Sequence, residues 1–317
     1  MSSYWLKDVG VRFNAFREAA LPEEIVDVVI IGAGISGAST AYHLAKHGTA
    51  GNVVLVEKYG ISAGATGNNG GFICPGTSER FSASVERYGL EVTQQLFDFT
   101  VNCTKAVKSF VEDTKADCEL RFHGSVLLAS NEEELRELML SFEQLSSYGV
   151  HVEWWDEVQC TERTSSTSFL GGLYKPQAGI MWAAKLVFAL VDEAVKLGVK
   201  VLTHNAVQSV DRTDPDGLVR VQTERGVITT RKVVHCMNAW SRDLLPSLQE
   251  VIIPVRNQVR PISQNQVCTR THCFTNAKIP LCSIHSCSSA DYDRPHAETV
   301  GLWAFCESRL RVLHAAP

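Results

Sequence analysis

The chain has 317 residues, of which 45% are hydrophobic and 21% are charged, and its net charge is -5. This composition is typical of a globular protein with room for two domains or one large interleaved domain, and it argues against general disorder. Because the basic residues form no block, we expect neither a nucleic acid nor an anionic membrane as a partner.

The first 24 residues show neither an uninterrupted apolar core nor a small-residue cleavage site, so we expect no secretory signal. Residues 25–45 are rich in apolar residues, but Asp27 and the glycines that follow argue against a transmembrane span. Ten cysteines would suit a disulfide framework only in a small secreted chain. We therefore expect reduced thiols and an intracellular protein of the cytoplasm.

A strand, a glycine-rich turn and a helix follow one another from residue 28. Residues 28–31 form a β-branched run typical of a strand buried on both faces. Gly32, Gly34 and Gly37 then have the spacing G-x-G-x-x-G. The first glycine permits a tight turn, the second lets the backbone approach a pyrophosphate, and the third lets helix and strand pack closely. The free N–H groups and the dipole of the helix would face the anion.

A second strand, residues 53–56, ends on Glu57, which follows Gly37 by twenty residues. A carboxylate at this distance can accept hydrogen bonds from both hydroxyls of an adenosine ribose, and it would repel a 2′-phosphate. The pattern predicts a dinucleotide site and disfavours NADP, but it leaves FAD and NAD open.

The stretch "GISAGATGNNGGFICPG", residues 60–76, contains six glycines. Such a segment cannot form a stable helix or strand interior. It suits a backbone that wraps around a second, bulkier part of a ligand, although a flexible surface loop would have a similar composition.

The middle of the chain predicts alternating helices and strands. A 3–4 residue apolar period predicts one amphipathic helix over residues 84–114, with Val92, Leu96, Phe99, Cys103, Val107 and Phe110 on its buried face. Strands are expected at 121–129 and 151–159, and a capping box of Ser130 with Glu133 would begin a helix between them. A helix over 183–197 would end at Gly198, followed by strands in residues 199–210 and 233–240.

Taken together, these segments resemble the FAD-dependent amine oxidoreductases, which include D-amino-acid, glycine, sarcosine and γ-glutamylputrescine oxidases. The resemblance lies in "DVVIIGAGISGASTAYHLA", "VVLVEK", "SAGATGNNGG", "AGIMWAAKLVFALVDEAVKLGVKVLTHNAVQSV", "KVVHCMNAWSRDLLP" and "IPVRNQV", and covers about residues 26–259. Asn68 stands where the family usually has arginine, which removes one cationic contact near the cofactor.

The resemblance implies an α/β fold with a discontinuous Rossmann-like FAD domain and an α+β substrate domain. The FAD domain would comprise residues 25–75 and 176–262, the substrate domain residues 76–175, and residues 1–24 would be an N-terminal extension. The cofactor contacts that the motif and the resemblance imply are Gly32, Gly34, Ile35, Ser36, Gly37, Glu57, Lys58, Ala65, Thr66, Asn69, Gly70, Gly71, Val207, Asn238, Ala239 and Trp240. Val207 could equally be a plain core residue.

Several other side chains invite a functional reading but suit a structural one better. His43 and His47 have the spacing of metal ligands but lack a third ligand nearby, so we expect no metal there. Cys74 could attach a flavin, yet most buried cysteines are apolar filler. Trp154 with Trp155 is expected to pack in the core, and Arg242 and Arg256 to form surface ion pairs.

Residues 264–317 differ in character from the rest, since they carry half of the cysteines and four of the ten histidines without a sustained period. The family normally adds further strands and a glycine-rich segment over the flavin ring, whereas Gly301 is the sole glycine after Gly226. An out-of-frame or mis-spliced sequence, a divergent genuine C-terminus and a zinc site all remain open. The zinc ligands would come from Cys268, Cys273, Cys282, Cys287, His272 and His285.

The resemblance implies an FAD-dependent oxidoreductase that oxidises a C–N bond of a small amine or amino acid by hydride transfer to flavin N5. A non-catalytic truncated flavoprotein and an NAD-linked dehydrogenase are the alternatives. No side chain in the sequence stands out as an acid or base, so we assign no catalytic residue.

Overall fold

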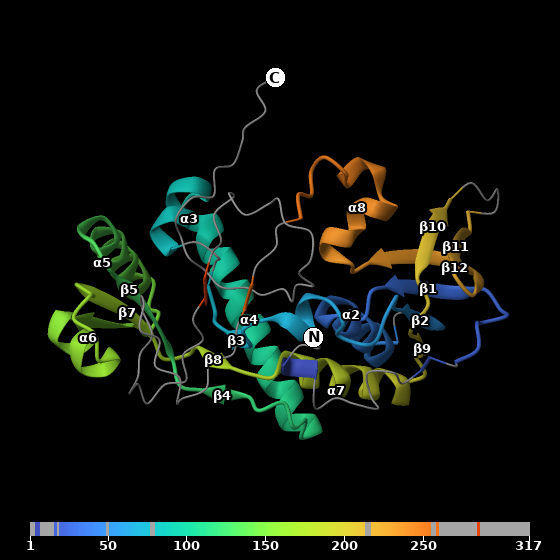
Figure 1. Ribbon diagram of the computed structural model, residues 1–317, viewed down its shortest axis with the longest axis horizontal. Coiled ribbons are helices and arrows are strands. Elements are labelled where there is room, and N and C mark those ends of the chain that lie inside the picture. Colours follow the sequence, from blue (N-terminus) through green and yellow to red (C-terminus); the bar gives the residue numbers. More distant parts are fainter. Residues whose placement is uncertain are drawn as a thin grey trace.

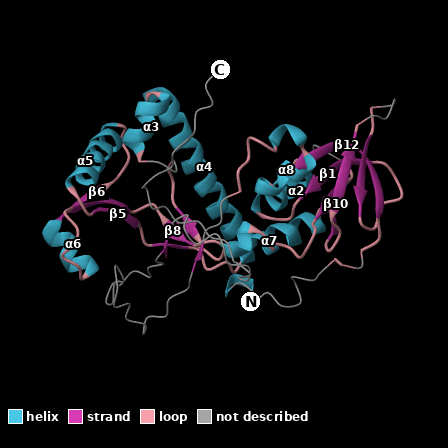
Figure 2. Ribbon diagram, turned by 45° about the horizontal axis from the view of Figure 1, so that its top comes forward, coloured by secondary structure: helices cyan, strands magenta, loops and turns pink. Residues whose placement is uncertain are grey.

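The computed structural model of the chain describes residues 4–6, 16–17, 19–48, 51–76, 80–212, 217–254, 258–259 and 284–285. Their elements form two lobes, and the long helix α4 (Leu90–Thr114) runs between them (Figures 1 and 2). Beyond residue 259, only β14 (Ile284–His285) is described, paired with β13 (Gln258–Val259). The expectations for residues 264–317, including the zinc alternative, therefore lie outside the described residues.

A six-stranded sheet with the order β10-β11-β12-β1-β2-β9 forms the centre of one lobe. Four of its strands are parallel, and the two at one edge form an antiparallel meander with β12. The strands are β1 (Val26–Ile31), β2 (Val53–Val56), β9 (Lys200–Leu202), β10 (Val207–Asp211), β11 (Val219–Thr223) and β12 (Gly226–His235). The sheet thus joins segments that the other lobe separates in sequence, and the predicted α/β class is confirmed.

Both faces of the parallel strands are buried, which explains their continuous apolar runs. Ile30 and Leu55 pack on one face against α2 (Ile35–Lys46) and α7 (Ala183–Lys196). Val29 and Val54 belong to a second cluster on the opposite face, with residues of β11 and β12. The glycine motif is therefore held at the carboxyl end of a strand that has no solvent face.

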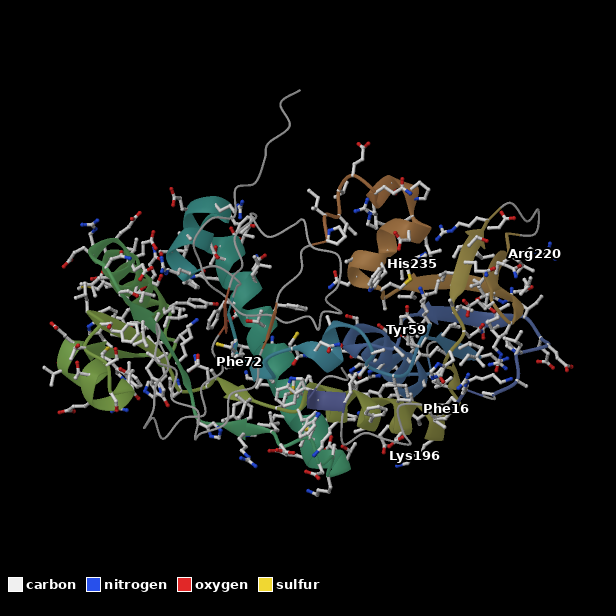
Figure 3. All side chains as sticks on the ribbon, in the orientation of Figure 1. Phe16, Tyr59, Phe72, Lys196, Arg220 and His235 are labelled. Carbon is white, nitrogen blue, oxygen red and sulfur yellow. The ribbon has the colours of Figure 1, made fainter. Side chains whose placement is uncertain are left out.

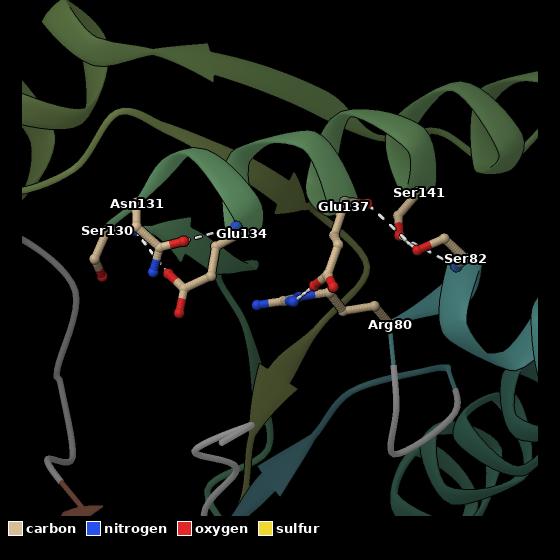
Figure 4. A network of polar contacts seen from close by, with 7 residues as sticks. All are labelled: Arg80, Ser82, Ser130, Asn131, Glu134, Glu137 and Ser141. Carbon is tan, nitrogen blue, oxygen red and sulfur yellow. Dashed lines mark hydrogen bonds and ion pairs between the residues drawn. The ribbon is translucent and has the colours of Figure 1, made fainter. Parts of the chain in front are cut away.

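The second lobe contains an antiparallel sheet with the order β5-β7-β6. Its strands are β5 (Ser125–Ala129), β6 (Glu153–Asp156) and β7 (Gly171–Lys175), and its helices are α3 (Phe81–Tyr88), α5 (Glu132–Ser147) and α6 (Glu157–Thr164). Phe97, Leu138 and Leu173 are central to its core. Polar contacts join α3 to α5: the hydroxyls of Ser82 and Ser141 lie 2.9 Å apart, and Arg80 forms an ion pair with Glu137 (Figure 4).

A small sheet with the order β3-β8-β4 lies between the two lobes (Figure 1). It consists of β3 (Phe72–Ile73), β4 (Arg121–Phe122) and β8 (Gly179–Ile180). The remaining elements are the short helices η1 (Tyr4–Leu6), η2 (Ala65–Asn68), η3 (Asn238–Trp240), α8 (Ser241–Leu244) and η4 (Pro246–Leu248). Among the described helices, none is both long and apolar enough to cross a bilayer.

The expected helix over 84–114 is two helices, and its expected buried face is wrong in the first half. Gly89 adopts φ +80°, which an α-helix does not allow, and it separates α3 from α4. Thr93 and Phe97 are buried, whereas four apolar residues predicted for the core are exposed: Val92, Leu96, Phe99 and Cys103. The face of α4 that packs against the core of this lobe is therefore not the face that the apolar period predicts.

Glycine geometry and capping change two further expectations. Gly124, at φ +80°, breaks the strand expected at 121–129 into β4 and β5. The helix expected after Ser130 has Asn131 as its N-cap, and the Asn131 side chain accepts the N–H of Glu134 at 2.9 Å. The Glu134 carboxylate accepts the N–H of Ser130, the residue before this N-cap, so the predicted capping box of Ser130 with Glu133 is wrong (Figure 4).

Two expected strands end early because helical turns begin within them. The strand expected at 151–159 stops at Asp156, whose side chain forms a capping box with Gln159 and begins α6. The strand expected at 233–240 stops at His235. Asn238, at φ +49°, opens the helical turn η3.

Candidate functional site

The turn after β1 is packed too tightly for any residue but glycine at two positions. Gly32 adopts φ +105°, and a Cβ there would lie 2.7 Å from the carbonyl oxygen of Cys236. A Cβ on Gly37 would overlap the Gly32 carbonyl oxygen. The amide of Gly32 donates to the carbonyl of Val56 at 2.8 Å, which fixes the turn to β2. These contacts agree with the roles that the spacing predicts for the first and third glycines.

The first turn of α2 is open to solvent at the place where the motif predicts a phosphate. Gly34 is the N-cap and supplies no side-chain cap. The amide of Ile35 donates to the hydroxyl of Thr66 at 3.0 Å, and both Ile35 and Ser36 are exposed. Because the N-terminal end of a helix carries partial positive charge, this surface can receive an anion.

The Glu57 carboxylate is fixed against the same turn by two backbone amides. One carboxylate oxygen accepts the N–H of Ala33 at 2.8 Å, and the other accepts the N–H of Tyr59 at 2.9 Å. Each oxygen has a second lone pair, so the group can still accept hydrogen bonds from two hydroxyls of a ligand. The sequence predicts the acid at this position but not the two amides that orient it.

The glycine-rich loop is held by its own asparagines, so it is not a loose surface turn. The Asn69 side chain donates to the Thr66 carbonyl at 2.7 Å and accepts the N–H of Gly71 at 2.8 Å. Asn68 donates to the carbonyls of Ala63 and Gly64 at 3.2 and 2.7 Å. The Asn68 side chain therefore stabilises the loop, and it carries no charge that could replace the arginine usual in the family.

Two exposed rings flank the glycines of this loop: Tyr59 lies just before it, and Phe72 follows Gly71 (Figure 3). Within it, Ala65 is exposed and Gly70 is half-buried. Gly71, at φ +70°, approaches the backbone of Met181 so closely that a Cβ would overlap the carbonyl oxygen. The loop is thus anchored at its far end by β8 and the residue that follows it.

The segment before β10 lies next to Glu57. The amide of Asn205 donates to the Glu57 carbonyl at 3.0 Å, two residues before Val207. Val207 itself is half-buried, and its side chain packs against the second core cluster. The Lys58 side chain is exposed, with its ammonium 5.2 Å from the ring centroid of Tyr59.

The segment after β12 lies against the glycine turn. The amide of Cys236 donates to the Ile31 carbonyl at 2.8 Å, and its own carbonyl lies beside Gly32. From there η3 continues with Asn238 exposed, Ala239 half-buried and Trp240 68% exposed. The structure therefore gathers the motif, Glu57, the loop and η3 around the carboxyl ends of β1, β2 and β12.

Sequence analysis does not identify two buried polar side chains near the site, Ser62 next to the glycine turn and Asn205 next to Glu57. Ser62 is fully buried, its amide donates to the Ala33 carbonyl at 3.1 Å, and its hydroxyl has no hydrogen-bond partner within the described part of the chain. The same is true of the Asn205 amide nitrogen. Buried polar groups are nearly always paired. The unpaired Ser62 hydroxyl, next to Ala33 of the glycine turn, and the unpaired Asn205 amide, next to Glu57, fit a polar ligand such as an adenine dinucleotide.

The other side chains considered for a functional role make contacts that suit a structural role. The His43 and His47 rings stack with centroids 5.9 Å apart, and burial and then the neighbouring His47 and Lys46 lower the pKa of His43. No group of three metal-binding side chains occurs among the described residues. The Cys74 thiol is exposed, 3.6 Å from the Ser125 hydroxyl. Trp155 is 2% exposed and stacks on Tyr174, as expected for core packing.

The fold and these contacts define a dinucleotide-binding α/β protein. Over residues 27–299 the chain matches the FAD dependent oxidoreductase family, and it belongs to that family. FAD, and not NAD, is the cofactor that membership implies. The match continues beyond residue 262, where we expected the resemblance to stop.

Relatives with known names are similar to the chain over part of their length. The probable oxidoreductase OrdL of Haemophilus influenzae is 26% identical over 251 residues, which are 76% of this chain and 57% of the relative. Gamma-glutamylputrescine oxidoreductase of Escherichia coli (strain K12) is 27% identical over 235 residues, 74% of this chain and 54% of the relative. The chain therefore spans less than two thirds of these relatives.

Among solved structures, glycine oxidase from Geobacillus kaustophilus superposes with a TM-score of 0.60 at 22% identity. The superposition covers 74% of this chain and 60% of the oxidase. At this identity the likeness supports the fold alone.

Proposed function

We propose that this chain binds FAD at the open end of α2 and takes part in the oxidation of a small amine or amino acid at a C–N bond. The observation that carries the proposal is the Glu57 carboxylate, which the amide of Ala33 holds at the glycine turn. When bound, FAD supplies the acceptor for the hydride equivalent that leaves the substrate carbon.

The residues divide into groups that would hold different parts of the cofactor. The pyrophosphate would lie at the first turn of α2, because the helix dipole favours an anion there. Glu57 would accept the ribose hydroxyls, and the loop would enclose the flavin side. The proposed contacts are Gly32, Gly34, Ile35, Ser36, Gly37, Glu57, Lys58, Ala65, Thr66, Asn69, Gly70, Gly71, Val207, Asn238, Ala239 and Trp240.

We propose further that residues 25–75 and 176–262 form the cofactor-binding unit and that residues 76–175 form most of the substrate unit. The sheet orders support this division, because the six-stranded sheet is built from strands before residue 57 and after residue 199, whereas β5 and β6 pair with β7 in a separate sheet. The name of one similar protein, gamma-glutamylputrescine oxidoreductase, supports an amine or amino acid as the substrate class. The chain's own part in the reaction would be to bind, orient and exclude water.

Flavin content is the direct test. After gel filtration, the purified protein, as isolated or after incubation with FAD, should retain flavin absorbance, whereas it should not change the fluorescence of added NADH. Glu57→Lys should abolish the retained flavin because a cation cannot accept hydrogen bonds from the ribose hydroxyls. A panel of amines and amino acids, mixed anaerobically with the loaded protein, would then identify the substrate by loss of that absorbance. Colourless protein that does not respond to FAD would refute the proposal.

A second candidate is a chain that binds FAD without turnover. In that case the protein would retain FAD with the same dependence on Glu57, and no member of the panel would bleach it.

A further inference from the structure

The N-terminal turn η1 contacts the cofactor loop although it lies outside the family match, which begins at residue 27. Figure 1 shows this turn beside the start of α7. Trp5 and Leu6 are half-buried and pack against the core cluster on the α2 and α7 side of the sheet. A segment before the family region is thus integrated into the core below the loop.

The turn is anchored to a rigid residue. The indole N–H of Trp182 donates to the Trp5 carbonyl at 2.8 Å, and the two indole rings meet edge to face with centroids 5.2 Å apart. Trp182 is 7% exposed, is the N-cap of α7, and donates its own amide to the Cys118 carbonyl at 2.7 Å. Edge-to-face aromatic pairs stabilise beyond the area that they bury.

On its other side the turn covers two glycines of the loop. The Leu6 side chain lies 2.9 Å from the position that a Cβ on Gly67 would occupy. The Trp5 ring lies 3.5 Å from the corresponding position at Gly71. Gly67 follows Thr66 directly, so Leu6 packs beside the residue whose hydroxyl accepts the Ile35 amide.

We infer that Trp5 and Leu6 are positioning residues for the cofactor loop: they hold residues 65–71 in the shape that places Thr66 against the first turn of α2. A segment rich in glycine loses more conformational entropy on ordering than other residues do. If the loop is ordered before FAD arrives, binding does not bear that cost, and affinity is higher. The inference rests on the proposed FAD site, but its structural half concerns the loop alone.

The far part of the N-terminal segment supplies a matched control. The Arg225 guanidinium donates to the carbonyls of Arg17 and Ala19 at 2.9 and 2.7 Å. Leu21 packs over Gly226, at 2.8 Å from the position of an added Cβ. Leu21 therefore belongs to the same segment and makes a similar contact with a glycine, but at the opposite side of the sheet from the loop.

The test compares Trp5→Ala and Leu6→Ala with Leu21→Ala in the full chain. Hydrogen exchange of the amides of residues 62–71 is measured without FAD, and FAD affinity is measured by quenching of flavin fluorescence. Both loop-side variants should accelerate exchange in the loop and weaken FAD binding by about tenfold, which corresponds to the loss of one apolar contact. Leu21→Ala should change neither quantity.

The two readouts separate the inference from the proposed function. Unchanged loop exchange in Trp5→Ala and Leu6→Ala overturns the inference even if FAD binds tightly. Faster loop exchange in a chain that never binds FAD supports the positioning of the loop and refutes the proposed function. If Leu6→Ala loses helical structure in far-UV circular dichroism, Leu6→Val is measured in its place, with a smaller change in the same direction expected.

Discussion

The hydroxyl of Thr66 accepts the amide of Ile35 at 3.0 Å, and this bond joins the glycine-rich loop to the first turn of α2. Thr66→Val keeps the shape and removes the acceptor. We expect a loss of about 1 kcal/mol in the free energy of unfolding and a weaker affinity for FAD, because the loop loses its tie to the helix. Denaturant unfolding and FAD titration measure both.

Thr104→Val is the control for this change. Its hydroxyl donates to the Thr100 carbonyl within α4, away from the proposed site. The control should leave FAD affinity unchanged, and equal effects of the two variants on affinity would contradict the role assigned to Thr66.

Glu57→Gln should weaken FAD binding without abolishing it. The glutamine keeps one acceptor oxygen but presents an NH₂ group to one of the two amides, Ala33 or Tyr59, that the carboxylate now accepts. Hydrogen bonds to a charged group are worth about 1.5–3 kcal/mol, so we expect a loss of roughly tenfold or more in affinity. Wild-type affinity in Glu57→Gln would show that the carboxylate does not bind the cofactor.

Gly37→Ala should prevent the turn from closing, because the added Cβ would overlap the Gly32 carbonyl oxygen. Gly64→Ala is the matched control, since no atom lies within 4 Å of its added Cβ and its φ of -82° suits any residue. Thermal unfolding should show a lower melting temperature for Gly37→Ala alone. An unchanged melting temperature for Gly37→Ala would show that α2 lies farther from the glycine turn than the structure indicates.

Two phenylalanines of α4 test which face of the helix is buried. Phe97 is 3% exposed and Phe99 is 66% exposed. Phe97→Ala should destabilise the protein by about 3–5 kcal/mol, as core truncations do, whereas Phe99→Ala should change stability by less than about 0.5 kcal/mol. The opposite order in denaturant midpoints would favour the face that the apolar period predicts.

His235 makes stability depend on pH. The residue lies at the end of β12 (Figure 3). Its ring nitrogens are buried and unpaired within the described part of the chain, and burial, followed by the charge of Arg212, lowers its pKa. Below pH 6.5 the unfolded chain therefore binds a proton that the folded chain does not, and the free energy of unfolding falls as the pH falls.

His235→Phe should flatten this decline between pH 7.5 and 5.5 in denaturant unfolding. His43, whose pKa is also lowered, is more exposed and should leave a smaller slope in the variant. An equally steep decline in His235→Phe would assign the dependence to other groups.

The sequence predicts the nucleotide-binding half of the fold well because its signals are local. The strand before Gly32, the helix after it and the acid at Glu57 are set by contacts among neighbours in one βαβ unit, and β2 occupies residues 53–56 as predicted. The second lobe was harder to predict. The exposure of Phe99 depends on where the core of another sheet lies, and the apolar period of α4 does not contain that information.

The same limit applies to the site. The acid could be predicted from spacing, but the amides that orient it, the orphan groups of Ser62 and Asn205 and the contact of Leu6 with Gly67 arise from tertiary packing. Polar residues in "THNAV" between two apolar strands were the available signal for Asn205. No comparable signal marks Ser62 among the small residues around it.

The pairing of β1 with β12 has a consequence for synthesis of the protein on the ribosome. Val26 lies opposite Thr230, so β1 cannot pair with β12 until the ribosome has added about two hundred further residues. Pairings this distant in sequence form slowly. Until then one edge of β1 remains without its partner, and chains at this stage are exposed to aggregation and to capture by chaperones.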